Sequence, residues 1–296
     1  MDKTKDNLRE LSIDGCELLG RGAHAVVYKI APDAIVKVYR EDIPLQRIKI
    51  EKKRAKRALI MRVPTAISFD IVRVGNSYGA VYELIDADPT DHFINESREN
   101  RDKFIDMSVE LLKLIHSKEV TTDDLSDMKA DHYRWLENAR ELTGDHKADI
   151  IKSLIYEIPD SHNLLHGDFH MKNIIISKGK PMLIDMDTLC FGDPVFDLAT
   201  ITNSYLIFPK MDPAAATMHL GISVEDAKYI WERTLELYLD GKTPGELNVI
   251  KNKCKILGLI RILDFARRGG DPIHKDLMIE KSLSFLDEGL SELQEK

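Results

Sequence analysis

The chain has 296 residues, 43% of them hydrophobic, with 42 Lys and Arg against 50 Asp and Glu and a formal net charge of −8. This composition excludes a disordered, collagen-like or coiled-coil protein, and the length suits two unequal lobes or one large domain. Cys16, Cys190 and Cys254 are too few and too far apart to indicate a disulfide framework or a zinc site. No apolar stretch approaches the ~18 residues of a membrane span, and the opening segment lacks the apolar core of a secretory signal. We therefore expect a soluble cytoplasmic protein that does not bind a membrane.

Strand-like patterns dominate the first 86 residues. Turn signals separate the segments 16–20, 25–30 and 34–39, and two more strand-like segments follow at 69–74 and 79–85. Residues 47–62 have the spacing of a helix that ends before Pro64. The first part of the chain is therefore predicted to be an antiparallel sheet with one helix.

Helical periodicity dominates from residue 87 onward. Apart from a hairpin at 173–185, the predicted helical segments are 101–118, 123–157, 223–239, 247–267 and 276–295. This order predicts an α+β chain of two segregated lobes, residues 1–86 and 87–296. The charge divides at the same place, with 16 basic and 12 acidic side chains before residue 87 and 26 and 38 after it. We expect the two lobes to bind different partners.

A glycine-containing loop joins the first two predicted strands. Gly20 and Gly22 would let backbone N–H groups approach a phosphate, although Ala25 occupies the third glycine position of a G-x-G-x-x-G pattern. A dinucleotide-binding fold would continue with a helix, but a strand follows this loop, so that fold is disfavoured. The alternative interpretation is a plain hairpin turn.

Lys37 lies in the third predicted strand, and Glu51 lies on the following helix among the apolar residues Ile48, Ala55 and Leu59. A buried glutamate needs a partner, so we expect an inward Lys37–Glu51 pair that could hold nucleotide phosphates. The alternative is an edge-strand lysine whose aliphatic stem covers apolar surface. The basic run at 52–57 favours a solvated helix face over a nucleic-acid site, because the net charge is negative and aromatic residues are not interleaved.

The segment HGDFHMKN, residues 166–173, and the hairpin after it carry the strongest signal. Pairing across the hairpin predicts that Asp168, Asn173 and Asp185 meet at one end of it. Oxygen ligands of this kind suit Mg²⁺, and Asp168 would accept a proton from an attacking hydroxyl or orient it. For any one of these acids, capping of a turn is the alternative.

Two further residues are expected to support this loop. The spacing of His162, His166 and His170 suggests metal ligation on a helix, but Gly167 breaks such a helix, so His166 is interpreted as a hydrogen-bonding support. Asp197 falls in the first turn of a helix that is predicted to start after Pro194. It could accept backbone N–H groups of the loop, and simple complementation of the helix dipole is the alternative.

Three motifs occur in order: His-Gly-Asp-x₄-Asn, then Ile-Asp-x-Asp at 184–187, then Gly-Asp-Pro-x-x-Asp-Leu-Ala at 192–199. Together they resemble the aminoglycoside phosphotransferase and choline kinase family, which are small-molecule kinases with a protein-kinase-like fold. With the glycine loop, the resemblance spans roughly residues 17–200. It implies a two-lobed kinase-like fold, ATP or GTP as co-substrate, Mg²⁺ as cofactor, and transfer of a phosphoryl group to a hydroxyl.

The resemblance also implies roles for individual residues. Asp168 would be the catalytic base, and Asn173 and Asp185 the metal ligands. Lys37, paired with Glu51, would hold the α- and β-phosphates, and the backbone of Glu83 and Ile85 would contact adenine. The complete implied nucleotide-binding set is Gly20, Gly22, Val27, Ile35, Lys37, Glu51, Glu83 and Ile85, and the implied supporting set is His166, Asp187 and Asp197.

The acceptor is predicted to be a cationic amino sugar or amino alcohol, because acids such as Asp123, Asp124, Asp127 and Asp131 make the second lobe negative. A neutral sugar or an amino acid is the alternative acceptor. A protein acceptor is disfavoured by the short segment that follows Asp187. A hypothesis from another class is a non-catalytic nucleotide-binding pseudokinase with a regulatory role. The sequence does not indicate an oligomeric state.

Overall fold

The computed structural model describes residues 7–22, 24–87, 89–122, 124–269 and 274–294, so Ala23 of the glycine loop and Asp123 lie outside the described residues. The chain divides into two compact units, Met1–Asp88 with Ile175–Thr188, and Pro89–Ile174 with Leu189–Lys296. Residues 175–188 thus group with the N-terminal unit, whereas the sequence pattern assigned them to the C-terminal lobe. Leu183 explains the grouping, because its N–H donates to Pro64 O at 2.8 Å.

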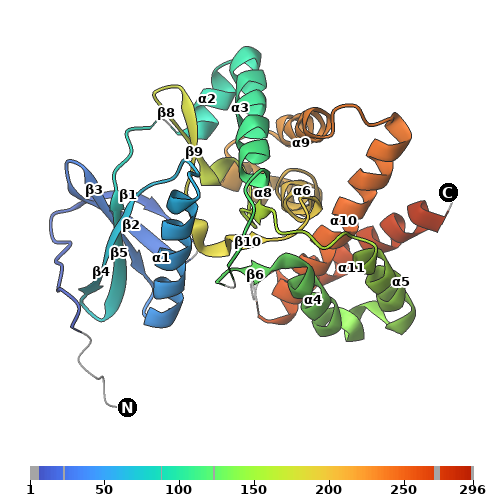
Figure 1. The fold of residues 1–296 in the computed structure, drawn as a ribbon, viewed down its shortest axis with the longest axis horizontal. Coiled ribbons are helices and arrows are strands. Elements are labelled where there is room, and N and C mark those ends of the chain that lie inside the picture. The colour runs from blue at the N-terminus through green and yellow to red at the C-terminus, as the bar shows by residue number, and fades with distance from the viewer. Residues whose placement is uncertain (1–6, 23, 88, 123, 270–273, 295–296) are drawn as a thin grey trace. The chain divides into compact units, whose positions relative to one another are not determined.

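The first unit contains the predicted antiparallel sheet (Figure 1). Its strands lie in the order β1-β2-β3-β5-β4, and the register sets Lys37 opposite Val27 and Ala80. Helix α1 and the hairpin β8–β9, which is followed by the short helix η2, complete the unit. The elements are β1 (Glu17–Arg21), β2 (Ala25–Ala31), β3 (Ala34–Tyr39), α1 (Leu45–Ile60), β4 (Ser68–Val74), β5 (Ser77–Glu83), β8 (Ile174–Ser177), β9 (Lys180–Leu183) and η2 (Met186–Thr188).

Helix α1 packs on one face of this sheet, where Ile48 contacts a cluster that includes Tyr39, Ile71 and Ala80. The buried residues of α1 are Ile48, Glu51, Ala55 and Ala58. We grouped Leu59 with Ile48 and Ala55 on the buried face of this helix. That prediction was wrong for Leu59, which is 41% exposed. Leu59 lies four residues after Ala55 and is exposed, whereas Ala58, three residues after Ala55, is buried.

The second unit is mostly helical, as predicted (Figure 1). A small sheet places β10 parallel to β6 and antiparallel to β7. The elements are α2 (Thr90–Glu96), α3 (Arg98–His116), β6 (Ser126–Asp127), α4 (Met128–Thr143), α5 (Asp145–Tyr156), β7 (Leu164–Leu165), η1 (Met171–Asn173), β10 (Cys190–Phe191), α6 (Val195–Thr202), the π-helical turn η3 (Asn203–Ile207), α7 (Phe208–Met211), α8 (Pro213–Leu220), α9 (Val224–Tyr238), α10 (Pro244–Arg267) and α11 (Lys275–Gln294).

Several segments of the second unit differ from the expectation. Helix α2 lies where no element was predicted, and the predicted helical segment 123–157 divides at Gly144 into α4 and α5. Helix α4 begins at Met128 and not near residue 123, because the Asp127 side chain accepts from the N–H of Lys129 at 2.8 Å and of Ala130 at 3.4 Å and so caps the helix. Residues 203–220, for which we predicted no element, form the turn η3 and helices α7 and α8. Among the described helices, none has both the length and the apolar character that crossing a bilayer requires.

The long helix α10 packs closely against α6 and η3 at Gly258. A Cβ atom at this position would overlap Asn203 Oδ1 and lie 3.1 Å from Ala199 O, and Asn203 Nδ2 donates to Gly258 O at 3.0 Å. We predict that Gly258→Ala lowers the free energy of unfolding by about 1–3 kcal/mol, because the added methyl overpacks the contact and displaces this amide. Urea unfolding measures the change.

Gly245→Ala on the same helix is the matched control for Gly258→Ala. A Cβ at Gly245 would have no heavy atom within 4 Å, so this variant is expected to change the unfolding free energy by less than about 0.5 kcal/mol or to stabilise the helix. Equal stability of the two variants would contradict the close approach at Gly258.

Candidate active site

In the first unit, the ammonium group of Lys37 lies between two carboxylates. Its Nζ is 2.9 Å from Glu51 Oε1 and 2.8 Å from Asp185 Oδ1, and the hydroxyl of Tyr82 donates to Glu51 Oε1 at 3.1 Å. Burial alone would lower the pKa of Lys37, but the charges and hydrogen bonds of Asp185 and Glu51 outweigh it and raise the pKa above its usual value. The predicted Lys37–Glu51 pair is confirmed, and Lys37 is cationic at neutral pH.

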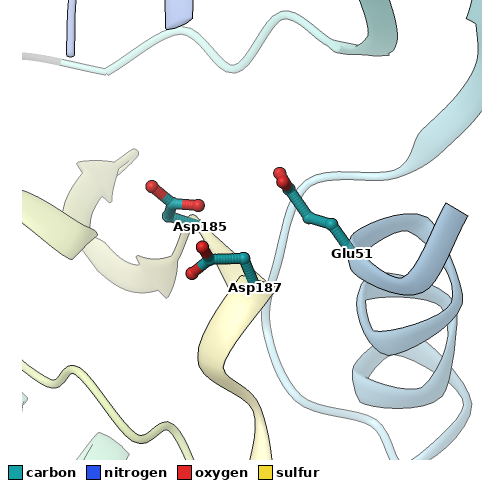
Figure 2. Close-up of side chains that lie close together, drawn as sticks. All are labelled: Glu51, Asp185 and Asp187. Atoms are coloured by element: carbon teal, nitrogen blue, oxygen red, sulfur yellow. The ribbon is translucent and has the colours of Figure 1, made fainter. Parts of the chain in front are cut away.

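Glu51 of this pair is one of three carboxylates that lie close together. Figure 2 shows Glu51 projecting from α1 toward Asp185 and Asp187, which follow β9, and oxygen atoms of the three groups lie within 4.8 Å of one another. Asp185 has a φ of 60°, in the left-handed region that costs free energy for a residue other than glycine. The site thus holds Asp185 in a strained backbone conformation that turns its carboxylate toward Lys37.

These acids differ in their fitness to bind a metal ion. Glu51 is 4% exposed and already accepts from Lys37 and Tyr82. The side chain of Asp185 is 41% exposed and uses only Oδ1 toward Lys37. An exposed carboxylate with a spare oxygen fits Mg²⁺, which takes few protein ligands and keeps water or phosphate oxygens. Asp185 therefore fits the predicted ligand role better than Glu51 does.

Asp187 is tied to the helix that carries Glu51. Its backbone carbonyl accepts from Arg54, and its Oδ2 lies 3.7 Å from Arg47 Nη2. These contacts join the segment after β9 to α1, so they are compatible with the supporting role that we predicted for Asp187.

A cavity of about 170 Å³ adjoins Lys37. Val27, Ile35 and Tyr82 contribute to its walls, and Lys37, Glu51 and Asp185 line it as well. Val27 and Ile35, which the resemblance placed in the nucleotide-binding set, thus line one cavity together with Lys37. The N–H of Glu83 donates to Ile67 O at 2.9 Å and so is not free for adenine, and the predicted backbone contact at Glu83 stays a prediction. The contact predicted for Ile85, which follows β5, stays a prediction.

The glycine loop lies among cationic groups. Gly20 pairs with Val27, and Gly22 N–H donates to Ala25 O at 2.8 Å. A Cβ would meet nothing within 4 Å at Gly20 and only one ordinary contact at Gly22, so packing does not require either glycine. Burial, followed by the charges of Arg47, Arg40 and Lys37, lowers the pKa of His24 in this loop. The N–H of Gly22 is therefore not free for a phosphate, but the space beside both glycines and the nearby positive charge suit a polyphosphate.

We predict that Lys37→Met lowers the affinity for nucleoside triphosphate about 10- to 100-fold, the loss expected for hydrogen bonds to a charged group. Calorimetry with ATP and GTP measures it. Lys29→Met on the neighbouring strand β2 is the control and should leave the affinity unchanged. A folded Lys37→Met variant with undiminished affinity would contradict a phosphate-binding role.

In the second unit, a buried carboxylate organises the HGDFHMKN segment. Asp197, 0% exposed in the first turn of α6, accepts from the N–H of Gly167 at 2.7 Å and of His166 at 2.8 Å. The backbone contacts predicted for Asp197 are therefore present. His116 Nε2 is 3.1 Å from Asp197 Oδ2, and His116 Nδ1 is 2.7 Å from the hydroxyl of Tyr238. Sequence reasoning missed these last two residues, which no motif marks.

Asp168 lies in a mixed electrostatic environment, with a side chain that is 41% exposed. His170 Nε2 is 3.4 Å from its Oδ2, and Arg261 Nη2 is 3.8 Å from its Oδ1. Arg261 also donates to Gly167 O. Burial would raise the pKa of Asp168, but the hydrogen bond and charge of His170 and the charges of Arg261 and His166 hold the pKa below its usual range. The group is therefore an anion throughout the physiological range.

Asn173 is oriented by the loop that it closes. Its Nδ2 donates to Asp168 O at 2.8 Å and lies 3.3 Å from Asp168 Oδ2. This orientation leaves Oδ1 as the oxygen for a metal ion. Asn173 ends the helical turn η1, whereas we expected it to begin a strand. Asn173 and Asp185 belong to different units, so their predicted meeting stays a prediction.

His166 is fully buried, and its Nδ1 accepts from Asp168 N–H at 3.3 Å. This contact agrees with the support expected from His166. His170 Nδ1 accepts from Lys172 N–H at 3.2 Å and thereby caps η1. Within the part of the chain that the structure describes, the one group of three metal-ligating side chains is Glu51, Asp185 and Asp187, which contains no histidine.

The chain resembles known proteins in both sequence and fold. The model of the APH family, described as a phosphotransferase enzyme family, matches residues 15–227. A search of curated proteins finds no match. Of the solved structures, the GDP complex of wild-type aminoglycoside 2'-phosphotransferase-IIIa is 13% identical over 94% of this chain and 93% of that chain, with a TM-score of 0.62.

Two further solved structures are similar at comparable levels. The ADP-bound aminoglycoside phosphotransferase APH(2'')-Ib is 15% identical over 92% of this chain and 91% of that chain, with a TM-score of 0.59. A choline/ethanolamine kinase family protein from Mesorhizobium loti is 13% identical over 93% and 87%, with a TM-score of 0.59. These structures confirm the predicted protein-kinase-like fold, and the family match confirms the predicted enzyme class. The chain belongs to the APH phosphotransferase enzyme family.

Proposed function

We propose that the chain transfers the γ-phosphate of ATP or GTP to a hydroxyl group of a small molecule. The observation that carries this proposal is the environment of Asp168. This carboxylate, ionised in the physiological pH range, lines cavities of the second unit and is held by Asn173, His170 and Arg261. The nucleotide-bound structures with the same fold support the nucleotide as co-substrate.

In the first unit, Lys37 would neutralise phosphate charge while Glu51 and Asp185 fix the position of its ammonium group. Val27 and Ile35 would contact the base, and the glycine loop at Gly20 and Gly22 would let the phosphates approach the backbone closely. Asn173 and Asp185 would hold Mg²⁺, which neutralises phosphate oxygens when bound. Glu51 would act through Lys37, because its Oε1 already accepts two hydrogen bonds.

In the second unit, Asp168 would accept a hydrogen bond from the acceptor hydroxyl and receive its proton as the new O–P bond forms. A carboxylate with a low pKa is a weak base, so its main contribution is orientation of the hydroxyl, and proton transfer comes late. Asp197 and His166 would maintain the loop in this geometry. This division of roles agrees with phosphoryl transfer by positioning and charge neutralisation.

A regulatory pseudokinase would be expected to lack one of the reactive groups. Lys37, Asp168, Asn173 and Asp185 are all present, and Asp168 is ionised, so catalysis is favoured over simple nucleotide binding. A protein acceptor is disfavoured by the short distance along the chain from Asp187 to α6, which begins at Val195.

The test is phosphorylation of an acceptor panel by the full chain with Mg²⁺ and either ATP or GTP. Aminoglycosides, amino alcohols, neutral sugars, cyclitols and hydroxy amino acids form the panel, and mass spectrometry detects the added phosphate. Product that depends on Asp168 supports the proposal. Tight nucleotide binding without any phosphorylated acceptor would favour the pseudokinase.

A further inference from the structure

Asp168 lines two cavities of the second unit, of about 400 and 300 Å³, which also share Ser204 and Phe208. Helices α7, α8 and α11 contribute the apolar part of the larger cavity, with Met211, Ala216, Leu220 and Met278 among its lining residues. An acceptor hydroxyl at Asp168 would therefore bring the rest of the acceptor into one of these cavities.

The two cavities contain few carboxylates that could bind a cation. Besides Asp168, Asp212 is the one acidic residue that lines either of them in the described part of the chain, and its Oδ1 already accepts from Ala215 N–H at 2.9 Å as the cap of α8. Transfer of an ammonium group from water into such a site is costly unless carboxylates offset the lost hydration. The larger cavity is therefore poorly suited to a cationic acceptor.

The charges that line the smaller cavity are positive apart from Asp168. Arg261 lies over the Trp135 ring, with its Cζ 5.6 Å from the ring centroid, and Arg268 contributes a second guanidinium. Arg268 pairs with the fully buried Asp264, which does not line the cavity. An amine in this cavity would lie beside two guanidinium groups, and the carboxylates nearest to them, Asp168 and Asp264, are already paired with them.

Of the four acids named above for a cationic acceptor, Asp123 lies outside the described residues, and the other three are engaged elsewhere. Asp124 accepts from the Thr122 hydroxyl, Asp127 caps α4, and Asp131 Oδ1 lies 2.9 Å from Arg134 Nη2. None of them lines either cavity. The negative balance of the second lobe is therefore not concentrated where the acceptor would bind.

Imidazoles and apolar walls offer other interactions. His170, His219 and His274 line the larger cavity. Burial, followed by the charges of His170 and Lys172, lowers the pKa of His219, so its ring is neutral at physiological pH. The neutral imidazole of His219 donates and accepts hydrogen bonds with hydroxyl groups, while Phe208 presents an aromatic surface to the apolar face of a ring.

Because the cavities beside Asp168 combine cationic and neutral polar groups with apolar walls, we propose that the acceptor is an uncharged polyhydroxylated ring, a sugar or cyclitol, and not an amine. This inference rests on the function proposed above. It replaces the cationic acceptor expected from overall charge with one selected by the groups that line the cavities.

Matched acceptor pairs test this proposal. Each neutral sugar or cyclitol is compared with its amino derivative at about pH 6.5, where the amine carries its proton, by calorimetry and by kcat/KM. We expect at least one neutral member to bind with a Kd about tenfold or more below that of its amine, and kcat/KM to follow the same order.

A variant with an added negative charge tests the cavity itself. His219→Glu adds a carboxylate to the larger cavity, whereas His219→Gln of similar size adds none. We expect His219→Glu to raise the amine-to-neutral ratio of kcat/KM about tenfold over His219→Gln, and thermal unfolding checks that both variants fold. An equal ratio in the two variants would count against the assignment of this cavity to the acceptor.

The outcomes separate the two proposals. Preferential binding and phosphorylation of the amine members would overturn the uncharged acceptor and leave the small-molecule kinase intact. The proposal of an uncharged ring would also be overturned if neither member of any pair bound at up to about 10 mM while an acceptor of another class was phosphorylated. Absence of all phosphoryl transfer while nucleotide binds would remove the proposed function, and the acceptor inference with it.

Discussion

Replacement of Asp168 by asparagine is expected to lower kcat by about 10²- to 10⁴-fold, the range for loss of a positioned general base. Asparagine preserves the shape of the side chain but removes the negative charge that accepts the proton of the acceptor hydroxyl. Single-turnover phosphorylation measures the chemical step, and nucleotide affinity should remain near that of the unmodified chain because Lys37 and its partners lie in the other unit.

Asp212→Asn is the matched control, since it removes the second carboxylate of the larger cavity and keeps a side chain that can cap α8. We expect its kcat to stay within about threefold of the unmodified chain, a change of less than 1 kcal/mol in the barrier. A comparable loss in both variants would show that charge in the cavity, and not the position of Asp168, governs the rate.

Stability is expected to decline steeply in acid because of His132. This side chain is 2% exposed, its Nδ1 is 2.9 Å from Met128 O, and its ring lies against Trp135 and Phe196. Burial is the main cause that lowers the pKa of His132 from 6.5 to about 3. The imidazole is therefore neutral in the folded protein and becomes protonated in the unfolded chain below about pH 6.5.

The depressed pKa contributes stability that is fully present above pH 6.5 and is lost as the pH falls toward 3. From pH 7 to pH 5 the loss from this group is about 2 kcal/mol, and at lower pH it approaches roughly 5 kcal/mol. Urea unfolding from pH 7 to pH 5 measures it. His132→Gln should flatten the dependence, whereas the exposed His146→Gln should not. Identical slopes in His132→Gln and the unmodified chain would exclude His132 as the cause.

Local patterns in the sequence predicted much of the fold and part of the candidate site. Alternation and helical spacing gave the five-stranded sheet and α1, and a glutamate on an apolar stripe led to the Lys37–Glu51 pair. The geometry at Asp197 was also predictable, because an acid in the first turn of a helix can accept N–H groups. These predictions rest on the repeat of a single helix or strand, because that repeat determines the face on which each side chain lies.

The missed residues belong to contacts between distant parts of the chain. Neither Tyr238 nor Arg261 is part of a motif, yet they contact His116 and Gly167 across 122 and 94 residues. The second carboxylate that contacts Lys37, Asp185, is 148 residues away from it. The acceptor class was predicted from net charge, which counts the acids but does not tell whether they cap helices, form ion pairs or line a cavity.

The anchoring of the HGDFHMKN segment has a consequence for how specificity can change. His116, Asp197 and Tyr238, which hold the loop, lie on α3, α6 and α9. The apolar side chains of the larger cavity come instead from α7, α8 and α11. Substitutions on these three helices can reshape the acceptor cavity while the anchor of the catalytic loop stays intact. The scaffold thus separates the part that must remain constant for phosphoryl transfer from the part that is free to diverge toward new acceptors.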